Sequence, residues 1–201
     1  MNVALWGNLR LYFKKDPTVG FLPLLQKGFY ITINTGNLQS ILCRICGLDA
    51  EQVRGRIQTV FLNGKPVDDM AGTNVHDGDC LALSAAMPGL VGATMRSGGV
   101  LAGFRHGISH RNTGDRSDER GGVLLIKLFN LLIAEMGPRF LRQGILVRPD
   151  DLRTLLRSPT PIQWDDCQKA ELNSRQVEID TLAAMDWDSI KDLIFLEVTF
   201  G

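Results

Sequence analysis

The stretch that decides the fold is VFLNGKPVDDMAGTNVHDGDCLALSAAMPGLVGATMRSGG, residues 60–99. It begins in a strand that Asn63-Gly64 turns back, and Asn-Gly is a strong short-range signal for a hairpin. Asp77-Gly78 predicts a further turn before a strand at Cys80–Ser84. Small residues follow this strand and end in Gly98-Gly99. The stretch therefore predicts the closing strands of a small sheet, followed by a glycine-rich tail.

The residues before this stretch predict strands and one helix. Val3–Phe13 and Phe29–Asn34 are expected to be strands, and Lys14–Lys27, which holds three residues of Pro and Gly, an extended connection. Asn37 is a suitable N-cap for a helix over Asn37–Cys46, which Gly47 ends. We expect this helix to cross a mixed sheet of four or five strands. The expected core residues are Ile41, Leu42, Ile45, Phe61, Leu81 and Leu83.

The segments FLNGKPVDD and VHDGDCLAL, preceded by two strands and a helix, resemble the ubiquitin-like β-grasp sulfur carriers of molybdopterin and thiamine synthesis. The resemblance covers residues 1–90. It implies an N-terminal β-grasp domain, and the residue pattern of the C-terminal half predicts a small α+β domain, so the expected fold class is α+β. It also implies a functional tail, because these carriers convert an adenylated terminal diglycine to a thiocarboxylate. The implied protein partner is an activating enzyme or a sulfur-accepting synthase subunit.

The tail of this chain offers three candidate glycines. Counted from the Asp-Gly-Asp turn, the terminal pair of that family falls on Gly89-Leu90, so only Gly89 matches. The nearest true pair is Gly98-Gly99, which becomes a terminal carboxylate only after cleavage behind Gly99. A linker that leaves the fold suits the same small residues. We therefore predict a protein-interaction module of sulfur-carrier ancestry, and the alternative is a processed carrier with its site at Gly98 and Gly99.

Composition predicts three segments. Residues 1–97 form the β-grasp domain, and residues 98–122 form a polar linker that contains RHGISHRNTGDRSDERGG. Residues 123–201 form the second α+β domain. In this domain Val123–Met136 is apolar almost all round, which predicts a buried helix. It is shorter than the roughly 20 residues that a membrane span needs.

Charge and cysteine content restrict the possible partners. The chain has 22 basic and 22 acidic residues, so no net charge attracts nucleic acid. An RNA-binding module is a second alternative, based on the Asn-Gly hairpin and on Arg44, Arg54 and Arg56. The four cysteines and the lack of a secretory pattern at the start predict a cytoplasmic protein with reduced thiols. We expect no membrane association, and a homo-oligomer is left open.

The sequence predicts no enzyme, no catalytic residue and no cofactor. P-loop, nucleophile-elbow and dinucleotide-binding motifs are missing from it. The acidic pairs lie beside turns or helix starts, where carboxylates accept backbone N–H groups: Asp68-Asp69, Asp150-Asp151 and Asp165-Asp166.

No metal site is predicted either. Cys43 and Cys46 form a CxxC on the expected helix, where core packing is favoured over metal or redox chemistry, because zinc needs two more ligands. His106 and His110 lie in the polar segment, which favours a solvated loop over a metal site.

Overall fold

The computed structural model describes residues 4–34, 36–105, 107–110, 121–157 and 162–201. The fold is mixed α+β with a large mixed sheet, which confirms the expected fold class at this level. The chain forms two compact units. Unit 1 comprises the described residues of 31–133, and unit 2 those of 2–30 and 134–201.

Unit 1 is built on a five-stranded part of the sheet in the order β2-β8-β7-β4-β5. β7 is parallel to β8 and antiparallel to β4, and β4 is antiparallel to β5. A separate pair, β3 and β6, is antiparallel. The boundary between the units falls within β2 and within α5 (Leu131–Gln143). The elements of unit 1 are β2 (Phe29–Ile33), β3 (Gly36–Asn37), α2 (Leu38–Cys46), α3 (Ala50–Arg56), β4 (Thr59–Leu62), β5 (Lys65–Pro66), β6 (Asn74–Val75), β7 (Cys80–Ser84), α4 (Gly89–Met95), the 3-10 helix η1 (Val100–Arg105) and β8 (Gly122–Phe129).

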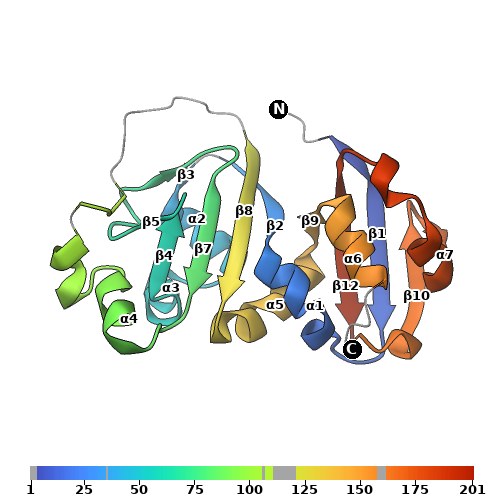
Figure 1. Ribbon diagram of the computed structural model, residues 1–201, viewed down its shortest axis with the longest axis horizontal. Coiled ribbons are helices and arrows are strands. Elements are labelled where there is room, and N and C mark those ends of the chain that lie inside the picture. The colour runs from blue at the N-terminus through green and yellow to red at the C-terminus, as the bar shows by residue number, and fades with distance from the viewer. Residues whose placement is uncertain (1–3, 35, 106, 111–120, 158–161) are drawn as a thin grey trace. The chain divides into compact units, whose positions relative to one another are not determined.

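Local signals explain the helices and the hairpin of unit 1. The Asn37 side chain accepts a hydrogen bond from the Ser40 N–H at 2.8 Å, and Gly47 ends α2 in the left-handed conformation. At the hairpin, Asn63 and Gly64 both have positive φ, as a type I′ turn requires. Figure 1 draws α2 and α3 behind β4 and β7. The strands and helix predicted here from sequence are therefore present.

Unit 2 has the sheet order β11-β10-β1-β12-β9. β1 runs parallel to β12 and antiparallel to β10, and β12 is antiparallel to β9. Its elements are β1 (Leu5–Phe13), α1 (Thr18–Lys27), α5 (Leu131–Gln143), β9 (Ile145–Val147), α6 (Pro149–Arg157), η2 (Trp164–Asp166), β10 (Cys167–Leu172), β11 (Arg175–Gln176), α7 (Ile179–Ala184), η3 (Trp187–Ser189) and β12 (Leu193–Phe200).

The structure groups the chain differently from the expected division at residues 97 and 122. The strand expected at Val3–Phe13 is present as β1, but it pairs with β12 and β10 rather than with the strands around Asn63-Gly64. In unit 1, the strand parallel to β7 is β8. The first strand is thus part of unit 2 because its pairing partners come from the C-terminal third of the chain.

Two predicted elements are wrong. Val123–Met136 is not one helix: β8 ends at Phe129, Asn130 has a φ of +55°, and α5 starts at Leu131. The run is apolar because β8 lies inside the sheet with alternate residues buried. Lys14–Lys27 is not extended either, because α1 begins after Pro17 and contains Pro23. Asp16 accepts the Thr18 N–H at 2.8 Å and fixes this helix start.

The expected core is largely present. Ile41, Leu42, Ile45, Leu81 and Leu83 are buried, whereas Phe61 is only half-buried. Among the described residues, no helix is both long enough and apolar enough to cross a membrane.

Candidate functional site

The predicted site glycines lie in a folded segment. Gly89 is the first residue of α4, and Gly98 and Gly99 lie in the turn that leads to η1. The Gly98 N–H donates to Asp68 Oδ1 at 3.0 Å, and the Gly99 N–H donates to the Arg96 carbonyl at 3.1 Å. The described part of the predicted tail and linker, residues 89–105 and 107–110, is called the cap segment below. It contains helix and turn rather than a free tail.

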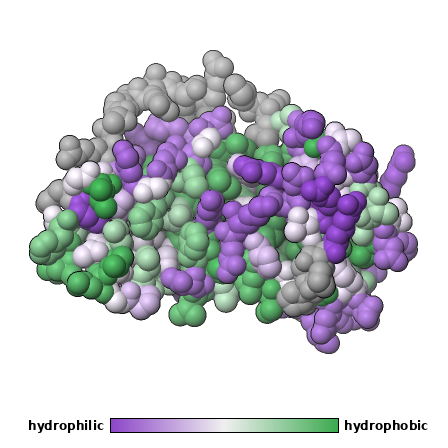
Figure 2. Space-filling model, in the orientation of Figure 1, coloured by the Kyte–Doolittle hydropathy of each residue, from purple (hydrophilic) through white to green (hydrophobic). Residues whose placement is uncertain are grey.

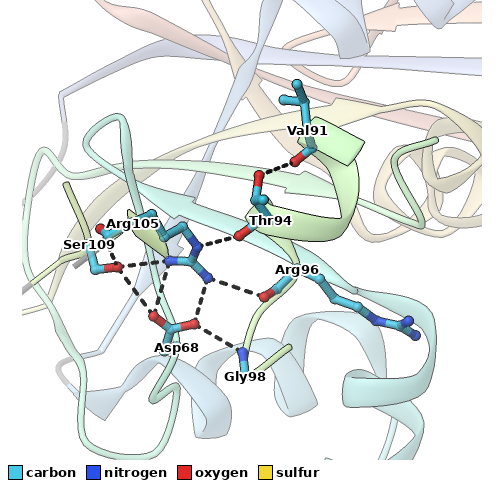
Figure 3. Close-up of polar contacts among 7 residues, drawn as sticks. All are labelled: Asp68, Val91, Thr94, Arg96, Gly98, Arg105 and Ser109. Carbon is cyan, nitrogen blue, oxygen red and sulfur yellow. Dashed lines mark hydrogen bonds and ion pairs between the residues drawn. The ribbon is translucent and has the colours of Figure 1, made fainter. Parts of the chain in front are cut away.

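The cap segment is held by one buried arginine. The Arg105 side chain is 3% exposed and its guanidinium forms a two-contact ion pair with Asp68: Nη2 lies 2.6 Å from Oδ1 and Nη1 lies 3.0 Å from Oδ2. Figure 3 shows the Arg105 side chain among the turns of the cap segment, with Asp68 opposite its guanidinium. Paired fork contacts of this kind are stronger and more directional than single ones.

Every N–H of the Arg105 guanidinium has an acceptor. Nε donates to the Thr94 carbonyl at 2.6 Å, Nη1 also donates to Ser109 Oγ at 2.9 Å, and Nη2 also donates to the Arg96 carbonyl at 3.2 Å. With the two bonds to Asp68, these contacts use all five donors of the side chain. Arg105 therefore joins the end of α4, the turn at residues 96–99 and residues 107–110 to Asp68, which lies in the loop after β5.

The apolar side chains of the cap segment lie on its surface. Five large apolar side chains of the cap segment are exposed by half or more: Leu90 at 76%, Val91 at 66%, Val100 at 100%, Phe104 at 84% and Ile108 at 53%. These five residues are called the apolar face below. Figure 2 shows hydrophobic surface over the region where Figure 1 labels α4. Exposed apolar patches of this kind mark interaction sites on folded proteins.

The other candidate residues from the sequence do not form a site. The four cysteines form no disulfide; Cys46 is buried and Cys43 is half-buried. His110 donates its backbone N–H to the Pro66 carbonyl at 2.8 Å, and His106 lies outside the described residues. In the described part of the chain, no three His, Cys, Asp or Glu side chains are placed to hold a metal ion.

The acidic pairs have structural contacts. Asp68 binds Arg105, and Asp69 Oδ1 accepts the Gly72 N–H at 2.9 Å within its own turn. Asp151 pairs with Lys27, and Asp166 lies 3.6 Å from the Lys15 ammonium. At least one carboxylate of each pair is therefore engaged in a turn or in an ion pair.

The shifted pKa values belong to unit 2. Hydrogen bonds from Lys169 and then Tyr12 lower the pKa of the Glu171 carboxyl, and the bond to Glu171 raises the pKa of Lys169. Burial raises the pKa of the Cys167 thiol. The first two shifts arise in an exposed group of partners on β1 and β10, and the third makes Cys167 a weaker nucleophile.

Sequence reasoning missed the Asp68–Arg105 pair. Arg105 belongs to a run of Gly, Arg, Ser and His that is typical of a solvated linker, and Asp68 belongs to a turn. The available signal was the apolar sequence VLAGF directly before Arg105, because a linker rarely has so many apolar residues.

Comparison of the sequence with protein-family models and with curated proteins, and of the fold with solved structures, found no match.

Proposed function

We propose that this chain is a protein-interaction module that associates with a second copy of itself through the apolar face of the cap segment. The observation that carries the proposal is the exposure of Leu90, Val91, Val100, Phe104 and Ile108, between 53% and 100%, on a segment that Arg105 holds in place. A fixed segment loses little conformational freedom on binding, so more of its apolar burial becomes binding free energy.

The charge of the cap segment favours a second copy as the partner. Between residues 89 and 105 the charged side chains are Arg96 and Arg105, and Arg105 is paired with Asp68. Two such surfaces meet with little like-charge repulsion. A strongly charged partner would gain little electrostatic attraction, because this surface carries few charges. A two-fold contact uses the same patch on both copies, and an apolar patch is complementary to itself. The proposed contact places this patch at the centre of an interface of about 800 Å² per partner.

We also propose that unit 1 is a β-grasp-like domain of sulfur-carrier ancestry in which β8 replaces the expected first strand. The proposal is supported by the order of α2, β4, β5 and β7 along the chain and by the parallel pairing of β7 with β8. The absence of disulfides among the four cysteines fits a reducing compartment, and we propose the cytoplasm.

A processed carrier needs cleavage behind Gly99, and the cut would place Arg105 and Asp68 on different fragments. The activating enzyme or synthase subunit as partner, and the RNA-binding alternative, stay predictions.

The test compares a double variant of the apolar face with a control variant at an exposed valine elsewhere. Val100 lies in the apolar face at 100% exposure, and Val19, 65% exposed in α1, is the matched control outside it. Sedimentation equilibrium should show a concentration-dependent dimer for the full chain and for Val19→Ser. Val100→Ser together with Phe104→Ser should weaken dimerisation by at least a factor of about 100, since each copy loses two large apolar groups worth roughly 1.5–3 kcal/mol each. A monomer at every concentration, or equal weakening by Val19→Ser, would contradict the proposal.

A further inference from the structure

Unit 1 contains a pocket of about 420 Å³, with polar and apolar lining, beside the turn at residues 96–98. Its polar lining comes from α2, α3, the residues that follow α3 and β5, and this turn: Gln39, Arg54, Gln58, Asp68, Asp69, Arg96 and Ser97. Its volume lies in the range of small-molecule sites. None of the residues of the apolar face lines it.

The two arginines of the pocket have unused donors. Arg54 Nη1 donates to Gln39 Oε1 at 3.3 Å, a long hydrogen bond. The Arg96 guanidinium has no hydrogen bond or ion pair with any residue that the structure describes, and Figure 3 shows it directed away from the Arg105 network. Both arginines are exposed, and because each guanidinium carries five N–H donors, most of the donors in this pair have no acceptor among the described residues.

A third donor is the hydroxyl of Ser97. Its Oγ is buried and has no hydrogen-bond partner within the described part of the chain, although the Ser97 N–H donates to the Gln58 carbonyl at 2.9 Å. Buried hydroxyls without a partner are uncommon in native proteins, and each one calls for an explanation. The Ser97 hydroxyl is therefore a donor that lacks an acceptor at the edge of the pocket.

Several of the acceptors that line the pocket are already engaged. Asp68 accepts hydrogen bonds from Arg105, Gly98 and Ser109, and Asp69 Oδ1 accepts the Gly72 N–H. The groups that remain free to bind a ligand are therefore mostly hydrogen-bond donors. Two of them, Arg54 and Arg96, carry positive charge. An oxyanion is the group that matches them, because guanidinium binds carboxylate and phosphate oxygens in a planar fork.

We propose that this pocket binds a small molecule through a carboxylate or phosphate group, held by Arg54 and Arg96 and accepting a hydrogen bond from the Ser97 hydroxyl. The carboxylate of Asp69 opposes accumulation of negative charge, so ligands with one such group fit better than polyanions. No residue of the apolar face lines this pocket, so its ligand is separate from the partner proposed above.

The test is a titration of the isotope-labelled full chain, followed by backbone amide NMR. Inorganic phosphate and acetate are added in separate arms, with chloride keeping the ionic strength constant. Saturable shifts of the Ser97 and Gly98 amides are expected in at least one arm, and the arm that saturates identifies the oxyanion. Absence of saturation in both arms would overturn the proposal.

Variants locate the binding. Arg96→Gln or Arg54→Gln should raise the dissociation constant by roughly tenfold, since each removes charge-assisted hydrogen bonds. The control is Arg44→Gln, because Arg44 is exposed on α2 and does not line the pocket; its dissociation constant should stay within a factor of two. Ser97→Ala should weaken binding and raise the melting temperature of the ligand-free chain. If Arg44→Gln weakens binding as much as Arg96→Gln, the effect is general charge screening and the proposal fails.

Discussion

Replacing Arg105 with methionine should release the cap segment from unit 1. The change removes five hydrogen bonds, leaves the Thr94 and Arg96 carbonyls without this donor, and leaves Asp68 with only Gly98 and Ser109 as donors. Breaking a buried ion pair by removing one partner destabilises a protein by about 3–5 kcal/mol. The Asp68 side chain is 36% exposed, so water screens part of its charge, and we expect the lower end, about 3 kcal/mol.

The assay combines urea denaturation with limited proteolysis. Denaturation measures the free energy of unfolding, and proteolysis shows whether new cleavage falls within residues 89–105. Arg105→Lys should reduce the free energy of unfolding by about half as much as Arg105→Met, because lysine keeps the charge but has three donors instead of five and no planar fork. The matched control is Arg44→Met, an exposed position on α2 where the change should stay within about 0.5 kcal/mol.

A double-mutant cycle with Asp68→Asn isolates the pair itself. If Arg105→Met changes the free energy of unfolding by no more than the Arg44 control, and cleavage does not move into the cap segment, Arg105 does not hold that segment. The same result would remove the rigid support on which the proposed interaction surface depends.

Three further outcomes test the fold and its ionisable groups. Leu83→Ala, at a fully buried position on β7, should reduce the free energy of unfolding by about 2–5 kcal/mol in urea denaturation. Gly98→Ala should destabilise by about 1–2 kcal/mol because its φ is +63°, whereas Gly55→Ala, in open space on α3, should stabilise by roughly 0.5–1 kcal/mol; equal effects in thermal unfolding would refute this reasoning. Because the pKa of Glu171 is lowered by Lys169, its contribution to stability is present above the ordinary value of 4.5 and is lost as pH falls through the lowered pKa. Glu171→Gln should therefore flatten the acid side of the stability–pH curve, and an unchanged acid side would contradict the assignment.

Elements whose signals are local could be predicted from the sequence. The cap at Asn37, the left-handed end at Gly47 and the Asn63-Gly64 turn each fix the backbone within a few residues. Their conformations depend little on the rest of the chain, so the helix over 38–46 and the hairpin at residue 63 agree with expectation.

Elements that depend on distant partners could not be predicted in the same way. The apolar run at 123–129 suits a buried helix or a buried strand equally well, and pairing with β7 decides for the strand. The sequence predicts a strand at Val3–Phe13, which is present as β1, but its partner β12 lies almost 190 residues later in the chain. Such pairings leave no local mark in the sequence.

The candidate site was missed for a related reason. The sequence predicts Gly98 and Gly99 as a carrier tail or a linker, whereas in the structure Gly98 bonds to Asp68, which pairs with Arg105, 37 residues further along the chain. The apolar sequence VLAGF before Arg105 indicates a folded segment, but it does not identify Asp68 as the partner of the arginine. The same limitation applies to Arg96 and Ser97, whose shared pocket depends on residues from α2 and α3.

The most direct test of the proposed function is hydrogen–deuterium exchange of the full chain at low and high protein concentration. If two copies associate through the apolar face, amides in residues 89–105 should exchange more slowly at high concentration, while peptides that cover α1 should not change. The slowing should disappear in the chain with Val100→Ser and Phe104→Ser. Exchange in residues 89–105 that is the same at both concentrations, or slowing confined to other peptides, would contradict the account.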